Sequence, residues 1–233
     1  MKEITQIRKL SIWIFFIPLI AINLCLFISQ NYEILNNTIF VVDHIGRSEF
    51  SIPYLDGSLS ISRASRTFPQ YLIFKPAMII TAITLYYYWK SNNNLINKYR
   101  STNVEYKFKT FGILSAVFLA IHSIFLGIKF DIQIYKLMRR VVLLLFIIFE
   151  LIAQGIIVYH FFKIKETISD LINKKVLILK ALLVSILAIV AVLSLPILLD
   201  KGNTHFKHAL EWNYFVGVIL FYLLTRFFWK RTT

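Results

Sequence analysis

The segment from Asp43 to Met78 gathers most of the side chains on which chemistry or recognition can depend. It reads DHIGRSEFSIPYLDGSLSISRASRTFPQYLIFKPAM and is rich in hydroxyl and guanidinium groups. Arg63 and Arg66 are neighbours if the chain is helical there, and two guanidinium groups can hold a phosphate through paired hydrogen bonds. We therefore predict a phosphate site, the alternative being that the arginines pair with Asp43, Glu49 or Asp56. The residues assigned to the site are Asp56, Ser58, Ser60, Arg63, Arg66 and Gln70.

A second group of polar residues, His205, His208 and Glu211, follows the pattern H-x-x-H-x-x-E. On a helix this spacing drifts around the axis, so the three side chains do not share one narrow face. A zinc ion would also need a further ligand from elsewhere in the chain. We predict no metal and no cofactor, and no catalytic residue is identified by spacing alone.

The composition is that of a membrane protein. Of the 233 residues, 58% are hydrophobic and only 16% are charged, whereas about a quarter are charged in a typical soluble domain. Several apolar runs reach the roughly 20 residues that cross a bilayer core. We predict one domain over residues 1–233, an all-α polytopic membrane helix bundle with six transmembrane helices. The predicted spans are Leu10–Gln30, Tyr71–Trp89, Thr110–Ile128, Val141–Phe162, Val176–Leu199 and Trp212–Trp229.

The basic residues predict the orientation of the bundle. The net charge is +14, but Lys and Arg lie mainly between apolar segments, which favours a role in topology and excludes nucleic acid as a partner. More of them fall on the cytoplasmic side if both termini are cytoplasmic, with Arg139 and Arg140 as the main exceptions. The first loop, residues 31–70, is then non-cytoplasmic.

Short elements are predicted in the polar connections. Alternation over Phe50–Tyr54 favours an extended segment. A short helix after the Asp56-Gly57 turn is expected to begin at Ser58 or Ser60 and to end by Pro69. Ser91–Asn94 is expected to form a polar turn after the second span.

Polar side chains inside the spans are expensive in a membrane and are candidates for function. In the predicted orientation most of them lie beneath the first loop, so we predict a polar cavity there. Glu150 is alternatively a structural partner of His122 or Lys75. His160 and Lys180 are expected to extend to the inner interface. The residues assigned to the cavity are Asn23, Lys75, His122, Glu150, Gln154, His208 and Glu211.

The first loop and the second span carry a resemblance to a known family. Ile52-Pro53-Tyr54, Ser58-Leu59-Ser60-Ile61-Ser62 and the run Pro69–Lys75 are similar to motifs of the FRAG/DRAM/Sfk superfamily, whose members are like the N-terminal domain of CWH proteins. The Glu211-Trp212 pair is similar to an acidic–aromatic pair of the DRAM branch. The resemblance implies a six-span fold and lipid-related work in the plasma membrane or endomembranes.

These observations lead to one expected function and two alternatives. We expect an integral, multi-pass membrane protein that recognises or regulates membrane lipids, with phosphate-bearing or anionic headgroups as its partners. The first alternative is a lipid acyltransferase or hydrolase with His122 or His208 as general base. The second is a proton-coupled transporter in which Glu150 titrates.

Overall fold

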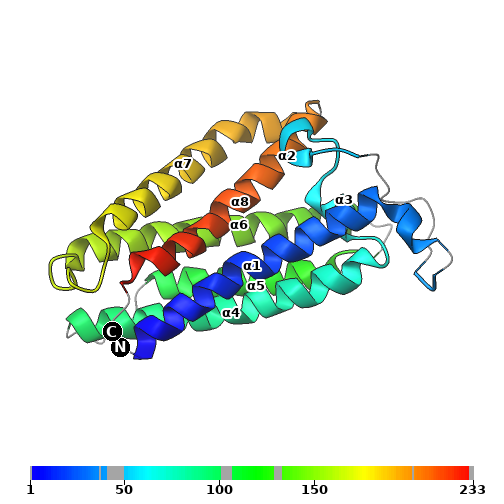
Figure 1. Cartoon of the computed structure of the whole chain (residues 1–233). Coiled ribbons are helices and arrows are strands. Elements are labelled where there is room, and N and C mark those ends of the chain that lie inside the picture. The colour runs from blue at the N-terminus through cyan, green and yellow to red at the C-terminus, as the bar shows by residue number, and fades with distance from the viewer. Residues whose placement is uncertain are drawn as a thin grey trace.

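Six long helices and three short ones account for the computed structural model, which describes residues 2–36, 38–40, 50–100, 107–128, 133–200 and 202–230. The long helices lie roughly lengthwise in the molecule (Figure 1). The described residues contain no strand, and Ile172 and Trp229 form an isolated antiparallel bridge. The predicted all-α class is therefore confirmed. The elements are α1 (Lys2–Gln30), η1 (Tyr32–Leu35), α2 (Pro53–Asp56), α3 (Ile61–Ser65), α4 (Gln70–Arg100), α5 (Lys107–Phe125), α6 (Gln133–Ile164), α7 (Lys174–Leu199) and α8 (Thr204–Phe228).

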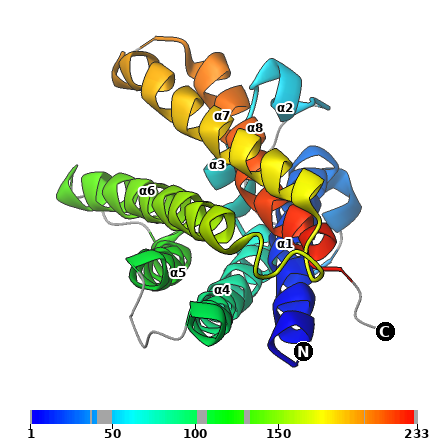
Figure 2. The same ribbon diagram turned by 90° about the vertical axis from the view of Figure 1, so that its left-hand side faces the viewer.

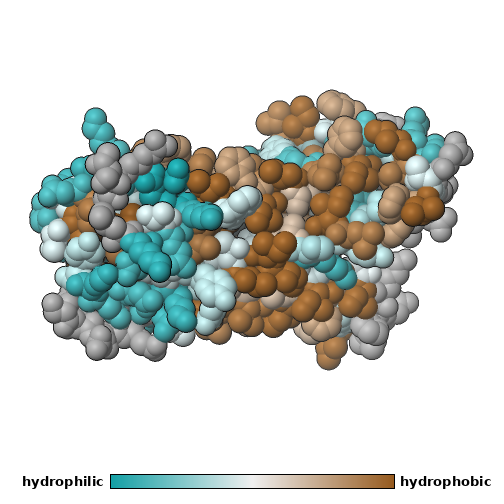
Figure 3. Space-filling view, turned by 60° about the horizontal axis from the view of Figure 1, so that its bottom comes forward, coloured by the Kyte–Doolittle hydropathy of each residue, from teal (hydrophilic) through white to brown (hydrophobic). Residues whose placement is uncertain are grey.

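Five helices (α1, α4, α5, α6 and α7) are long and apolar enough to cross a membrane, which makes the chain a multi-pass membrane protein. The sixth predicted span lies in α8, which is 25 residues long. It falls outside the five because Glu211, Asn213 and Arg226 interrupt its apolar sequence. Apolar residues dominate one part of the surface and hydrophilic residues gather at one end (Figure 3).

The long helices form a closed ring. Neighbours in contact are α1 with α4, α4 with α5, α5 with α6, α6 with α7, α7 with α8, and α8 with α1 (Figure 2). Figure 1 places both chain termini at one end of the ring, here called the terminal end, and α2 and α3 at the other, here called the loop end. Side chains that point inward from different helices therefore meet in one interior.

Two local predictions are wrong. The chain becomes helical at Pro53 rather than staying extended through Tyr54, because proline suits the first position of a helix. Ser91–Asn94 lies within α4 and forms no turn. Ser91 and Asn92 are buried, and the Asn92 amide donates a 2.9 Å hydrogen bond to the Tyr88 carbonyl four residues earlier. Helix packing thus overrides the polar sequence.

A close helix contact limits what residue 112 can be. A Cβ atom at Gly112 of α5 would lie 2.3 Å from side-chain atoms of Trp89, a fully buried residue of α4. At Gly155 of α6 the nearest atom to such a Cβ, a methyl of Val184, is 3.7 Å away. The two positions therefore differ in the space available, although both are glycines within long helices.

We expect Gly112→Ala to lower the thermal stability of the protein in detergent, because overpacking of a filled interior costs about 1–3 kcal/mol. Gly155→Ala is the matched control and is expected to be neutral or slightly stabilising, because alanine favours helix by about 1 kcal/mol. Thermal unfolding of both variants measures this. Equal unfolding temperatures for the two variants would contradict the described contact between α4 and α5.

Candidate functional site

Side chains from the first two turns of α8 and just beyond bind the backbone of the first loop. Each of these four side chains donates to a carbonyl within residues 54–59 of the loop, so this part of the loop is held against α8. Trp212, the most deeply placed of them, is fully buried and also packs its ring 4.8 Å from that of Tyr54. The bonds join His205 to Asp56 (3.2 Å), His208 to Gly57 (3.0 Å), Trp212 to Leu59 (2.7 Å) and Asn213 to Tyr54 (2.7 Å).

The turn between α2 and α3 is built for this contact. The Asp56 carboxylate accepts 2.8 Å hydrogen bonds from the backbone N–H groups of Ser58 and Ile52, and these bonds hold the pKa of Asp56 below its ordinary value. Gly57 has φ +60°, a left-handed conformation, and a Cβ there would lie 1.7 Å from the His205 carbonyl oxygen. Glycine is therefore required by both backbone angle and space.

Several residues of the predicted phosphate site shape the loop. Besides Asp56, Ser60 is the N-cap of α3, and its hydroxyl accepts a 3.2 Å bond from the Arg63 N–H, as predicted for a cap at this position. Gln70 is buried, and its side-chain amide forms a 3.0 Å hydrogen bond with the Thr67 hydroxyl. The Ser58 hydroxyl is buried and lies near the Asp56 carboxylate.

The arginines of the site lie in a basic cluster, which we define as Arg63, Arg66 and Arg139. Arg63 is exposed and Arg66 is half-buried. Burial, together with the nearby charges of Arg63 and Arg139, lowers the pKa of Arg66. Arg139, from α6, is the member that the sequence did not assign to the site. It stood out only as a basic residue at odds with the predicted orientation.

No carboxylate forms an ion pair with the basic cluster within the described part of the chain. Three acidic partners were considered for the arginines. Of these, Asp56 accepts hydrogen bonds from backbone N–H groups with both of its carboxylate oxygens. Asp43 and Glu49 lie outside the described residues. The cluster therefore concentrates positive charge at the loop end.

Two histidines lie close to the basic cluster. His208 is near Arg63, and burial is the main reason that its pKa is lowered. His122 is buried in α5 near Arg139, and its Nδ1 has no partner among the described residues. The structure thus places these two residues of the predicted cavity beside the predicted phosphate site.

Other residues assigned to the cavity are spread over the loop end. Asn23 accepts a 3.0 Å bond from the Tyr54 hydroxyl. Lys75 is partly exposed and donates to the Ile124 carbonyl at 3.1 Å. Glu211 is partly buried near the backbone N–H groups at the start of α3, and burial raises its pKa to about 7.

Glu150, by contrast, lies in the interior of the ring and is almost fully buried. Its carboxylate accepts a 2.6 Å bond from Ser115, a 3.0 Å bond from Gln154 and a third bond from the Tyr222 hydroxyl. These donors come from α5, α6 and α8. No bond joins Glu150 to His122 or Lys75 in the described structure, so the structural partners differ from those considered from the sequence.

Lys180 also lies in the interior, and the expectation that it reaches the interface is wrong. It is fully buried in α7 and donates a 2.7 Å bond to Thr225 of α8. Its ammonium group lies 3.8 Å from the ring centroid of Phe221, a contact that stabilises a cation away from water. The Tyr88 hydroxyl of α4 lies 3.2 Å from the same Thr225 oxygen. We call Ser115, Glu150, Gln154, Tyr222, Tyr88, Thr225 and Lys180 the interior polar network.

No three His, Cys, Asp or Glu side chains are grouped to hold a metal ion in the ranges that the structure describes. The chain matches no family model, no curated protein and no solved structure. The resemblance to the FRAG/DRAM/Sfk superfamily therefore stays a prediction.

We expect Tyr222→Phe to destabilise the protein, because it removes a hydroxyl donor from a buried carboxylate, a loss of about 1–3 kcal/mol. Tyr86→Phe is the matched control, since Tyr86 is an exposed residue of α4. Thermal unfolding in detergent compares the two. The role of the interior polar network would be refuted by a Tyr222→Phe protein as stable as the Tyr86→Phe protein.

We expect Gly57→Ala to release the first loop from α8, because a methyl group cannot fit against the His205 carbonyl. Limited proteolysis with trypsin detects this as faster cleavage after Arg63 and Arg66 than in the wild type. Gly155→Ala serves as the control and should be cleaved there at the wild-type rate. Unchanged cleavage in Gly57→Ala would show that the loop does not need this contact.

Proposed function

We propose that the protein binds the phosphate-bearing headgroup of a membrane lipid at the loop end. The observation that carries the proposal is the basic cluster, in which the positive charges of both Arg63 and Arg139 act on Arg66. Like charges held together are costly, and a phosphate group that accepts hydrogen bonds from two arginines relieves this cost. Arg63 and Arg66 are the proposed headgroup contacts, and Arg139 adds a third positive charge to the cluster.

Exposed apolar residues of the same loop support a lipid rather than a soluble phosphate compound. Phe50 is 83% exposed and Leu55 is 81% exposed. Ile52, in the same loop, and Leu72, in the first turn of α4, are also exposed. Exposed apolar groups beside basic ones are typical of surfaces that meet the boundary between headgroups and acyl chains.

The anchoring of the first loop supports binding by a preformed site. Hydrogen bonds from α8 hold the backbone on the N-terminal side of α3, and Ser60 caps that helix. The backbone that carries Arg63 and Arg66 is thus ordered before a ligand arrives, which lowers the entropic cost of binding.

The enzyme and transporter alternatives have less support. His208, one of the two candidate bases, uses Nδ1 in its bond to the Gly57 carbonyl. Glu150, the candidate proton carrier, has three donors within the protein. Both arrangements are explained by the packing of helices and loop.

We expect Arg66→Gln to reduce the amount of anionic phospholipid that co-purifies with the protein in mild detergent. Loss of a hydrogen bond to a charged group costs about 1.5–3 kcal/mol, which corresponds to a decrease of about tenfold or more in affinity. Native mass spectrometry counts the bound lipids. Arg140→Gln is the matched control, because Arg140 is an exposed residue next to Arg139 but outside the basic cluster.

One outcome of the comparison between these two variants would contradict the proposal. Equal lipid retention by the Arg66→Gln and Arg140→Gln proteins would show that the basic cluster is not a headgroup site. Arg63→Lys/Arg66→Lys adds a graded test, since lysine keeps the charge and loses the paired geometry of the guanidinium group. We expect this variant to retain an intermediate amount.

A further inference from the structure

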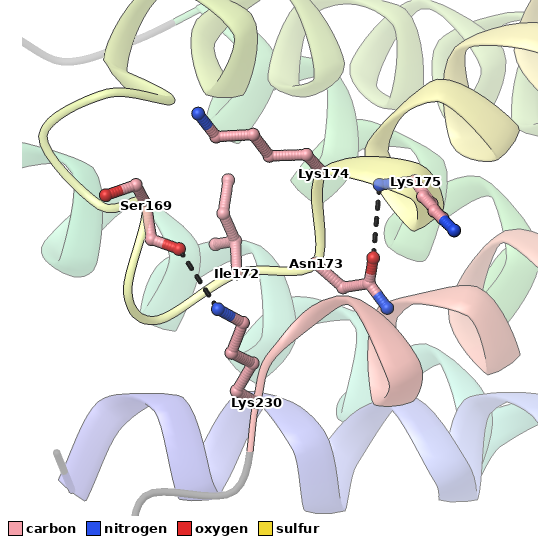
Figure 4. A pocket seen from close by; sticks show the side chains of 6 residues that line it. All are labelled: Ser169, Ile172, Asn173, Lys174, Lys175 and Lys230. Atoms are coloured by element: carbon pink, nitrogen blue, oxygen red, sulfur yellow. Dashed lines mark hydrogen bonds between the residues drawn. The ribbon is translucent and has the colours of Figure 1, made fainter.

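A hollow of about 480 Å³ opens at the terminal end, where the C-terminal end of α8 meets the loop before α7. It lies at the opposite end of the ring from the basic cluster (Figure 1). Figure 4 shows the residues that line it, among them three lysines. They are Ser169, Ile172, Asn173, Lys174, Lys175 and Lys230.

The walls of the hollow are fixed by backbone hydrogen bonds. The Asn173 N–H donates to the Phe228 carbonyl at 2.8 Å, and the Lys230 N–H donates to the Leu171 carbonyl at 2.8 Å. Phe228 and Trp229, between these bonds, are almost completely buried. The hollow is therefore held by two segments that are far apart in the sequence and locked side by side.

Two of the three lysines extend over the same side of this frame. In Figure 4 the side chains of Lys174 and Lys230 extend toward the Ser169 side of the hollow, whereas that of Lys175 extends away from it. The Lys230 ammonium group donates to the Ser169 carbonyl at 3.3 Å. Arg8 of α1 adds a guanidinium group nearby, 3.5 Å from the Lys230 carbonyl oxygen.

The start of α7 carries positive charge where a helix favours negative charge. Lys174 and Lys175 occupy its first turn, which contains no acidic residue. The N-terminus of a helix has a partial positive charge, so cations there are unfavourable and an anion is stabilised. The two acidic residues of the preceding loop are Glu166, which pairs with Lys174 at 2.9 Å, and Asp170; both are exposed.

An apolar stripe begins directly beside the hollow. Ile178 and Leu182 follow Lys174 at intervals of four residues, so all three share one face of α7. Ile178 is 53% exposed and Leu182 is 54% exposed, and Ile186 continues the same face. A cationic group above an exposed apolar stripe matches the order of headgroup and acyl chain in a phospholipid.

We propose that this hollow is a second lipid site, which binds the phosphate of an anionic phospholipid headgroup between Lys174 and Lys230, with an acyl chain along Ile178 and Leu182. The site is at the other end of the ring from the basic cluster and does not rest on the function proposed there. If the predicted orientation holds, its lipid comes from the cytoplasmic leaflet, where anionic lipids are abundant.

The experiment uses dioctanoyl phosphatidic acid as the probe and native mass spectrometry of the full chain in detergent. Lys174→Gln/Lys230→Gln is expected to reduce the affinity of the hollow for phosphatidic acid about tenfold relative to the wild type, which is measured as loss of the lipid bound there. Lys90→Gln/Lys107→Gln removes the same charge from exposed residues outside the hollow and is the matched control. Equal losses in both double variants would overturn the proposal, because they would show a general effect of charge.

A variant that is expected to increase retention of the probe sharpens the test. Glu166→Gln removes the carboxylate that competes for Lys174, so it is expected to increase retention of the probe, and a decrease or no change would count against the site. Inorganic phosphate serves as the second probe. If it displaces phosphatidic acid at equal concentration, the hollow is a site for free phosphate and the lipid assignment is overturned; weak displacement supports it.

Arg66→Gln separates the two proposed sites. Loss of phosphatidic acid in Lys174→Gln/Lys230→Gln alone supports the hollow and leaves the basic cluster without support. Loss only in Arg66→Gln has the opposite meaning. Two independent decreases, each about half of the retained lipid, are expected if both sites bind.

Discussion

A carboxylate inside a ring of membrane helices needs hydrogen-bond donors from the protein, because the surrounding hydrocarbon has none. Glu150 finds three of them, and one, Tyr222, belongs to α8 and lies 72 positions away along the chain. Apolar side chains give little preference for one helix arrangement over another in lipid, since lipid tails are equally apolar. The interior polar network supplies that preference and sets how α5, α6 and α8 meet.

The same principle explains how α4 and α7 join the ring. Thr225 lies one turn beyond Tyr222 on α8 and receives the ammonium group of Lys180, with the Tyr88 hydroxyl beside it. Close approach adds to these polar contacts where Gly112 meets Trp89. The polar groups of the interior are thus bonded to one another. The charged groups proposed for recognition lie at the two ends of the ring, in the basic cluster and in the lysine-lined hollow.

The sequence predicted the features that depend on composition over long stretches. The long helices, the all-α class and the cap at Ser60 follow from apolar runs and local hydrogen bonding. It failed at Ser91–Asn94 and Lys180 because burial there depends on distant partners. Arg139 was missed for the same reason, since only the folded ring brings Arg139 of α6 near Arg66. Arg63 and Arg66 could be recognised as neighbours because they are three positions apart in the sequence, whereas the hollow joins residues some 60 positions apart along the chain.

Tyr222 and Thr225 lie on α8, which follows α6 and α7 in the chain, and this order bears on how the ring is assembled. Helices enter the membrane in sequence order, so Glu150 and Lys180 are synthesised before the side chains that complete their hydrogen bonds. A nascent chain that lacks α8 thus holds an incompletely bonded carboxylate and an ammonium group without its hydroxyl acceptor. Closure of the ring by α8, which also brings α1 into contact with its second neighbour, is then the step that completes the interior polar network. Before α8 is in place, the bilayer therefore contains polar groups whose hydrogen bonds the folded ring later completes.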